Sequence, residues 1–398
     1  MTLPTISRNI QLLSWFNFFS AFKLYSAVAI IYFSTVTNSL ALGISIFSIA
    51  QVSDAIFEIP TGILSDRVGR KYTVFLGAVA KLISLVCYAS GQSYFIFVIG
   101  AIFDGLSLAF HSGNNDALLY DTVSESGEKH KYHEYLGKTN SMFYPALTVA
   151  SLLGGFIASV SFPLVFWLSL IPQAICIAIS LKMIESKSHE KKLGNMYSHL
   201  KEAFRLLYTN IQLRRLSIAE IIKLSFEETA FQFQFLFYNT VWPVWAVGFT
   251  RSISAFGNFV SFRYSGKVIN KYSAINLLIF NNIVSRVIHI TALTFPSVAS
   301  PLLMSSTGFL YGITSVSKNK LLQEEFTDEQ RATMYSIITF LGNLLFGVIA
   351  IGIGMFADKL GAEKTLLIMQ FTFIPIILLY LQVFHSYRKN ILLNLVVV

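Results

Sequence analysis

The segment GILSDRVGRK, residues 62–71, joins two long apolar stretches and carries a dense group of charges between them. Gly62 and Gly69 permit a tight turn at positions where a Cβ atom would collide with a neighbouring helix. Asp66 is an anion that can lie against the N-terminus of another helix. The basic residues after it can pair with Asp121 or Glu125, at the end of a later apolar stretch. The segment therefore predicts a compact, charged connection between two helices.

The composition of the chain around this segment excludes an ordinary soluble enzyme. Of its 398 residues, 54% are hydrophobic and only 13% are charged, against roughly 25% charged in a typical soluble domain. So few polar residues cannot cover a water-facing surface, and the high apolar content excludes intrinsic disorder. The two cysteines, Cys87 and Cys176, lie in apolar stretches, which predicts neither a disulfide framework nor a metal site. The remaining class is a polytopic membrane protein.

The apolar residues are grouped into about twelve stretches, each near the ~20 residues that a helix needs to cross ~30 Å of hydrocarbon. These stretches lie near residues 11–33, 42–65, 72–90, 94–120, 139–160, 163–184, 214–238, 244–265, 274–295, 300–322, 333–356 and 363–385. We therefore predict an all-α polytopic membrane protein with 12 transmembrane helices.

The basic residues are concentrated in alternate connections between these stretches. The other connections contain no Lys or Arg, as around residues 34–41, 90–93, 159–162 and 296–299. By the positive-inside rule, both termini are predicted to be cytoplasmic. The net charge of +9 is thus explained by topology, and no nucleic-acid partner is expected.

The chain also looks duplicated. At an offset of 200 residues, Lys71 and Tyr72 match Lys271 and Tyr272. An offset of 195 places Asn140, Tyr144 and Thr148 opposite Tyr335, Thr339 and Asn343. Matches at corresponding stretches of both halves indicate a parallel structural repeat. The predicted division is an N-terminal six-helix bundle, a cytoplasmic linker and a C-terminal six-helix bundle, at residues 1–184, 185–213 and 214–398.

Residues 62–71, called the signature loop below, resemble the G-x-x-x-D-R-x-G-R-K signature of the major facilitator superfamily (MFS). The loop also lies between the second and third predicted helices, where that family keeps its signature. The runs EIPTG (58–62) and ALLYD (117–121) are similar to bacterial members. The resemblance implies two pseudo-symmetric six-helix bundles, a location in the cytoplasmic (inner) membrane, and transport by alternating access.

In that family the signature loop acts as a cytoplasmic latch that holds the two halves together. The resemblance assigns this role to Gly62, Asp66, Arg67, Gly69, Arg70, Lys71 and Asp121. The alternative is that these residues only supply positive charge that sets the topology. The latch is favoured, because charge alone requires neither the glycines nor Asp66.

Two departures from the family's drug:proton antiporters bear on the substrate. Those proteins usually carry Arg-x-x-x-Gly in the fourth span, where this chain has Ala101 and Gly105. Their fifth span carries Gly-Pro-x-x-Gly-Gly, of which only Gly154 and Gly155 remain here; these glycines allow helices to approach closely. The resemblance favours proton-coupled efflux of a drug or metabolite, as in small-molecule and multidrug exporters. The alternative is a proton-coupled importer or a carrier of an organic anion, nutrient or siderophore.

Ionisable residues within the predicted helices are candidates for the mechanism, because each is costly in hydrocarbon and usually faces a cavity or a partner. The proton-coupling candidates are carboxylates that can alternate between charged and neutral forms: Glu227, Asp54, Glu228, Asp104 and Glu58. The substrate-cavity candidates are cationic or polar residues: Lys23, His111, Asn115, Asn140, Tyr144, Thr148, Lys318, Tyr335, Thr339 and Asn343. The cations Lys23 and Lys318 favour the alternative of an anionic ligand.

Some of these residues also have a purely structural interpretation. Glu220 and Lys223 are expected to form an ion pair, and Glu58 could belong to the latch instead. His111 is expected to be a hydrogen-bonded histidine rather than a proton relay. Arg286 and His289 are expected to have interfacial or packing roles.

The sequence contains no metal-spaced His/Cys cluster and no nucleophile elbow, so we expect no enzyme activity, no cofactor and no bound metal. The expected partners are a small-molecule substrate, protons and the lipid bilayer. The protein is expected to be a monomer.

Overall fold

The structure is a computed structural model that describes residues 3–185, 205, 207–324 and 328–396. Every element in this part of the chain is helical, so the predicted all-α class is confirmed. The chain forms two compact units. The first unit comprises Met1–Lys192 and Trp242–Ala255, and the second comprises Leu193–Val241 and Phe256–Val398. The division into two six-helix bundles stays a prediction.

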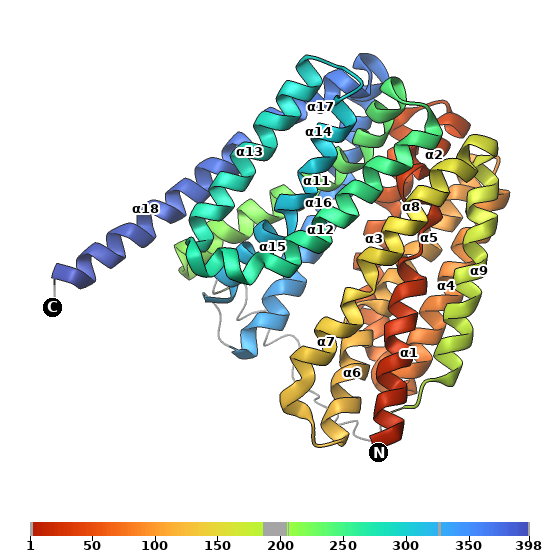
Figure 1. The fold of residues 1–398 in the computed structure, drawn as a ribbon, viewed down its shortest axis with the longest axis horizontal. Helices are drawn as coiled ribbons and strands as arrows, with labels where there is room; N and C mark the ends of the chain where they lie inside the picture. The colour runs from red at the N-terminus through yellow and green to blue at the C-terminus, as the bar shows by residue number, and fades with distance from the viewer. Residues whose placement is uncertain (1–2, 186–204, 206, 325–327, 397–398) are drawn as a thin grey trace. The chain divides into compact units, whose positions relative to one another are not determined.

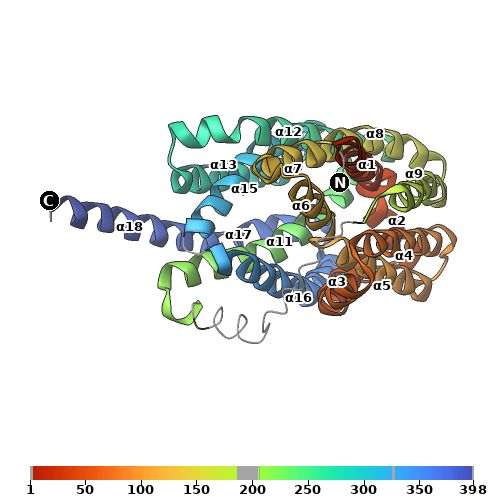
Figure 2. The ribbon, with the colours of Figure 1, turned by 90° about the horizontal axis from the view of Figure 1, so that it is seen from below.

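The first unit contains the elements that precede the predicted linker. They are α1 (Leu3–Ala21), η1 (Leu24–Ala27), α2 (Ala29–Thr37), α3 (Leu40–Val68), α4 (Arg70–Ser90), α5 (Tyr94–His111), α6 (Asn114–Glu125), η2 (Lys129–Lys131), α7 (Tyr132–Ser141), α8 (Phe143–Val160) and α9 (Phe162–Lys182). Helix α4 packs against both α5 and α9, and α3 packs against α5 (Figures 1 and 2).

The second unit contains most of the remaining helices. They are α11 (Ile211–Val241), α12 (Val244–Lys271), α13 (Ala274–Thr294), α14 (Ser300–Ser306), α15 (Gly308–Glu324), α16 (Asp328–Leu360), α17 (Ala362–Phe371) and α18 (Ile374–Val396). Helix α11 packs against α16, and α13 packs against α15 and α17. The first part of α12 lies in the first unit.

Within the described residues, eight helical segments are long and apolar enough to cross a membrane, or nine if α1 and α2 form one span bent by 46°. The other three predicted stretches, 214–238, 244–265 and 300–322, lie on α11, α12 and the pair α14–α15. Helix α11 is less apolar because it carries several charged residues, and α14 and α15 are separated at Thr307. The chain is therefore a polytopic membrane protein, as predicted.

Several of the predicted continuous stretches are interrupted. Helix α1 stops before Lys23, which precedes the short η1 helix. Helices α5 and α6 are separated by Ser112 and Gly113, and Gly113 has a φ of +70°. Apolar periodicity could not show these breaks, because the residues on both sides remain apolar or helix-compatible.

Glycines allow the closest helix contacts in the first unit. A Cβ atom at Gly105 would collide with the backbone of α3 at Ala50 and Asp54. A Cβ atom at Gly154 would collide with the Leu24 carbonyl, and one at Gly155 would lie 2.6 Å from the Trp245 carbonyl oxygen. The close approach predicted for Gly154 and Gly155 is therefore confirmed.

Candidate functional site

The signature loop is a one-residue connection in the first unit. Helix α3 ends at Val68, α4 begins at Arg70, and Gly69 between them has φ +100° and ψ 156°. L-residues rarely adopt this conformation, and a Cβ atom at Gly69 would also lie 2.8 Å from Glu185 Oε2. The prediction of a required glycine is thus confirmed at position 69. It is wrong for Gly62, which lies inside α3, where an added Cβ would meet no described atom within 4 Å.

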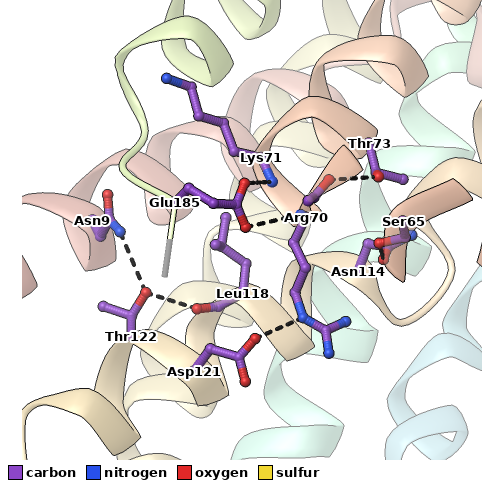
Figure 3. Close-up of polar contacts among 11 residues, drawn as sticks. Asn9, Ser65, Arg70, Lys71, Thr73, Asn114, Leu118, Asp121, Thr122 and Glu185 are labelled. Atoms are coloured by element: carbon purple, nitrogen blue, oxygen red, sulfur yellow. Dashed lines mark hydrogen bonds and ion pairs between the residues drawn. The ribbon is translucent and has the colours of Figure 1, made fainter. Parts of the chain in front are cut away.

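An ion pair joins the signature loop to α6. Arg70 Nε lies 2.7 Å from Asp121 Oδ2, and the two side chains are 26% and 13% exposed. Figure 3 shows the Lys71 side chain pointing away from Asp121. Asp66 and Arg67 are exposed at the end of α3. The structure therefore brings together two of the predicted latch residues, while the latch function stays a prediction.

The carboxylate of Glu185 caps the first turn of α4 (Figure 3). The backbone N–H groups of Arg70 and Lys71 donate to Glu185 Oε1 and Oε2 at 2.9 and 2.8 Å. The first N–H groups of a helix have no partner within the helix. From the sequence, Glu185 is predicted only to begin the linker. The signal for it was that α4 begins with two basic residues and has no acid in its first turn.

A second set of polar contacts fastens the end of α3 to the break between α5 and α6. Ser65 Oγ donates to Asn114 Oδ1 at 2.6 Å, and Asn114 Nδ2 donates to the Phe110 carbonyl at 2.6 Å. Thr61 Oγ1 donates to the Ala109 carbonyl at 3.1 Å. Since Ser65, Thr61 and Asn114 are all buried, these contacts hold the loop against α5 and α6.

A buried ion pair lies deeper in the first unit. Lys81 Nζ lies 2.5 Å from Asp104 Oδ1, and both side chains are less than a fifth exposed. The Lys81 ammonium also lies over the Tyr25 ring, 5.2 Å from its centroid. Asp104 is one of the residues predicted from the sequence, whereas Lys81 is not. A single lysine near the middle of an apolar helix was the available signal, because such a charge needs a partner.

Asp54 lies close to this ion pair, and Glu58 follows it one turn later on α3. Gly105 places α5 against Ala50 and Asp54 of α3, so Asp104 lies beside Asp54. Asp54 interacts electrostatically with both Glu58 and Asp104. The structure therefore gathers three of the predicted proton-coupling carboxylates in one unit.

The predicted cavity residues of the first unit lie on several different helices. The His111 ring packs on Phe16 at 5.4 Å, and within the described residues its Nδ1 has no hydrogen-bond partner. The expectation of a fully hydrogen-bonded histidine is therefore wrong for that atom. Asn115 Oδ1 is likewise buried without a partner there. Lys23 lies at the break between α1 and η1 and interacts electrostatically with His111.

The polar stripe predicted on the fifth span is split between α7 and α8. Asn140 Oδ1 accepts a hydrogen bond from Asn17 Nδ2 of α1 at 3.1 Å. The Thr148 hydroxyl donates within its own helix, to the Tyr144 carbonyl at 2.8 Å. The Thr148 carbonyl accepts from Ser252 at 2.8 Å.

The second unit has two ion pairs of its own. Lys318 Nζ lies 2.5 Å from Glu220 Oε1, and Lys223 Nζ lies 3.7 Å from Glu227 Oε1. The predicted Glu220–Lys223 pair is therefore wrong. A lysine on another helix reaches the buried Glu220, while Lys223 pairs with the carboxylate one turn further along α11. Glu228 accepts from Gln232 at 2.9 Å.

The remaining candidates in the second unit are only partly described. The Tyr335 side chain lies outside the described residues, and Thr339 and Asn343 are half-buried on α16. The Arg286 guanidinium lies over the Phe373 ring at 4.0 Å and donates to Gln370 Oε1 at 2.8 Å. These contacts fit the expected packing role of Arg286.

One carboxylate outside the spans has a perturbed pKa. Lys131 Nζ and Tyr135 OH donate to Glu128 at 2.7 and 2.8 Å. The hydrogen bond from Lys131, followed by that from Tyr135, holds the pKa of Glu128 below its ordinary value. Among the described residues, no group of three or more His, Cys, Asp or Glu side chains could hold a metal ion.

Comparison with protein families and known sequences identifies related transporters. The Major Facilitator Superfamily model matches residues 10–351. An "uncharacterized transporter" of Buchnera aphidicola subsp. Acyrthosiphon pisum is 29% identical over 143 residues, which are 36% of this chain and 35% of that protein. This chain thus matches only about a third of that relative. An "uncharacterized MFS-type transporter" of Methanocaldococcus jannaschii is 22% identical over 81% of this chain and 84% of its own length.

Solved structures share the fold at low sequence identity. A mutant form of the nucleoside transporter NupG has a TM-score of 0.80 at 13% identity, with 94% of this chain and 99% of that chain covered. A POT family transporter in complex with 5-aminolevulinic acid has a TM-score of 0.71 at 16% identity, with 96% of each chain covered. A bacterial homologue of the human lysosomal transporter Spinster has a TM-score of 0.75 at 14% identity, with 98% and 99% covered.

Proposed function

The chain belongs to the Major Facilitator Superfamily and is a secondary transporter of a small solute, not an enzyme, and we propose that it exports a drug or metabolite in exchange for protons. The observation that carries the proposal is the group of three carboxylates in the first unit, Asp54, Glu58 and Asp104, with Lys81 in contact with Asp104.

This group supports proton coupling because several negative charges lie close together within helices that span hydrocarbon. Like charges repel strongly where the dielectric constant is low, and an ionised carboxylate there needs a partner. Lys81 supplies one positive charge, to Asp104. A proton on Asp54 or Glu58 would reduce the repulsion among these carboxylates. A change of exposure between the two sides of the membrane would then move that proton.

In the second unit, Glu227 is the carboxylate best suited to exchange protons. Its side chain is 36% exposed and lies 3.7 Å from Lys223, which is too long for a strong hydrogen bond. Glu220 is only 5% exposed and is held at 2.5 Å by Lys318. The Glu227 carboxylate is therefore held less tightly by its partner than the Glu220 carboxylate. We propose Asp54 and Glu227 as the main coupling residues, with Glu228, Asp104 and Glu58 in supporting roles.

Proton coupling is tested in reconstituted vesicles that contain a pH-sensitive dye. The substrate is first sought by a thermal-shift screen of the purified protein against drugs, siderophores, nucleosides, amino acids and organic acids, since a ligand stabilises the native state by mass action. Transport of a compound found in this way should acidify or alkalinise the lumen together with solute flux. Asp54→Asn and Glu227→Gln should uncouple the two fluxes, whereas Glu134→Gln, at an exposed position of α7, should not. Solute flux that does not respond to a proton gradient would contradict the proposal.

The alternative function is a proton-coupled importer or a carrier of an organic anion, nutrient or siderophore. It relied on Lys23 and Lys318 as anion-binding cations. The contact between Lys318 and Glu220 at 2.5 Å offsets the charge of Lys318 within its own unit, which weakens this alternative. A screen that selects only carboxylate-bearing compounds would restore it, and loss of that binding in Lys23→Gln would identify the cation.

The proposal includes a location and a latch. We propose a monomer in the cytoplasmic membrane with both termini in the cytoplasm, from the distribution of Lys and Arg. Protease accessibility of terminal tags in right-side-out vesicles tests this orientation. Asp66 would act as part of the latch, and an unchanged conformational balance in Asp66→Asn would contradict that role.

A further inference from the structure

The chain that leaves α9 is fastened to two other helices of the first unit. Asn9 of α1 is fully buried and pairs with the main chain of Ile184. Its Nδ2 donates to the Ile184 carbonyl at 2.9 Å, and the Ile184 N–H donates to its Oδ1 at 3.0 Å. Asn9 Nδ2 also contacts Thr122 Oγ1 of α6 at 3.3 Å. This double hydrogen bond fixes the direction of the main chain just before Glu185.

Glu185 lies at the N-terminus of α4, where the charges of the helix itself are unfavourably arranged. Arg70 and Lys71 are the first two residues of the helix, which contains no acid in its first turn. Cations near a helix N-terminus are disfavoured by the helix dipole, and anions are favoured. Gly69 has no side chain with which to cap the helix. The Glu185 carboxylate supplies both the missing charge and the missing hydrogen-bond acceptors.

Arg70 is consequently held by both its main chain and its side chain. Its main-chain N–H donates to Glu185 Oε1 at 2.9 Å, and its side-chain Nε donates to Asp121 Oδ2 at 2.7 Å (Figure 3). The first contact places the start of α4, and the second connects that start to α6. A shift of Glu185 would therefore move the residue that carries the ion pair.

We propose that Glu185 is a positioning residue of the signature loop, which acts through Arg70 to maintain the Arg70–Asp121 ion pair and ties the start of the linker to that loop. Asn9 supports it by fixing Ile184. A displacement of Glu185 would then be passed to the signature loop through the N–H groups of Arg70 and Lys71. The proposal does not depend on the coupling ion, the substrate or the direction of transport.

The first test measures hydrogen exchange in the full-length protein in lipid nanodiscs. In Glu185→Ala, the amides of Arg70 and Lys71 should exchange about fivefold faster, the factor for a lost N-cap of about 1 kcal/mol. Glu185→Gln retains an oxygen acceptor without the charge, so its effect should be smaller. The matched control is Glu134→Gln, which removes an exposed carboxylate of the same unit and should leave these amides unchanged. Unchanged exchange in Glu185→Ala, or an equal effect in the control, would overturn the proposal.

The second test asks whether Glu185 acts through the ion pair. Spin labels at the exposed positions Lys129 and Lys267, one in each unit, report the distribution of distances in a background without the native cysteines. Glu185→Ala and Asp121→Asn should each shift this distribution, and the double variant should shift it no further than Asp121→Asn alone. Shifts that add in the double variant would show that Glu185 is only a local cap and would overturn the proposal.

A third variant tests whether Asn9 of α1 positions Glu185. Asn9→Asp retains the acceptor for the Ile184 N–H but loses the donor to the Ile184 carbonyl. It should speed exchange at Arg70 and Lys71 in the same direction as Glu185→Ala, although neither amide contacts residue 9. Normal exchange at these amides in a folded Asn9→Asp protein would show that Asn9 does not position Glu185.

Discussion

The predicted duplication matches two connections that lie 200 residues apart, one in each unit. The helices that follow these connections begin with different caps. In the first unit, the cap of α4 is Glu185, more than 100 residues away in sequence. In the second unit, α12 continues to Lys271 and α13 begins at Ala274. There the side chain of Ser273 accepts from the Asn276 N–H at 3.3 Å. One helix is capped from a distance and the other by its own neighbour.

This difference separates a loop that depends on tertiary structure from one that does not. A local cap such as Ser273 forms whenever its helix forms. A remote cap forms only when the end of α9 is in place, so the cap of α4 depends on the position of that segment. A displacement of that segment is therefore expected to affect the start of α4 and not the connection at Ser273.

The largest effect is expected from Gly69→Val. Gly69 has φ +100° and ψ 156°, a conformation that costs another residue about 1–3 kcal/mol, and its Cβ would press on the Glu185 carboxylate. We expect a lower thermal unfolding midpoint and less monodisperse protein on size-exclusion chromatography. The control is Gly266→Ala, within α12 of the second unit, where an added Cβ meets no described atom within 4 Å and helix propensity favours alanine. Equal stability of the two variants would contradict the backbone argument.

The next largest effect is expected from Asp121→Asn. It leaves the Arg70 guanidinium without its ion-pair partner, at a site where Arg70 is 26% exposed. Loss of a partner costs about 3–5 kcal/mol in a fully buried pair, but solvent reduces this at a partly exposed site to about 1–2 kcal/mol. Thermal unfolding in detergent measures the loss. Lys271→Gln, at the end of α12, is the control because Lys271 is exposed. An equal loss of stability in this variant would contradict the prediction that the ion pair makes the signature loop different from its counterpart.

The sequence predicted those features that depend on neighbouring residues. Apolar length predicted the spans, and the signature predicted the special conformation at Gly69. It did not predict Glu185 or Lys81, because their partners are distant in sequence and are brought together only by packing of α4 against α5 and α9. The same cause explains the error at Glu220. Helical spacing favoured Lys223, but Lys318, 98 residues away, lies closer at 2.5 Å.

A smaller effect is expected from Ser273→Ala, which removes the local cap of α13. The expected loss is about 1 kcal/mol, confined to the first turn of that helix. Hydrogen exchange should be faster at Asn276 and unchanged at Arg70 and Lys71. The distance distribution between labels at Lys129 and Lys267 should also stay the same. If Ser273→Ala shifts that distribution as Glu185→Ala does, the local and remote caps are not functionally different.

The smallest effect is expected at Glu128, a partly exposed carboxylate whose partners are both local. Hydrogen bonds from Lys131 and Tyr135 hold the pKa of Glu128 below its ordinary value of 4.5. Because the folded-state pKa is the lower one, the stabilisation is fully present above pH 4.5 and is lost as the pH falls through the folded-state pKa. Hydrogen exchange of residues 129–135, corrected for intrinsic rates, should therefore be slightly faster in Glu128→Gln than in the unaltered protein at pH 7. The exchange rates of the two proteins should converge in acid.

A difference that persists below the folded-state pKa of Glu128 would show that Glu128 acts through something other than its charge. A large difference at pH 7 would show that a local contact can matter as much as the remote cap at Glu185.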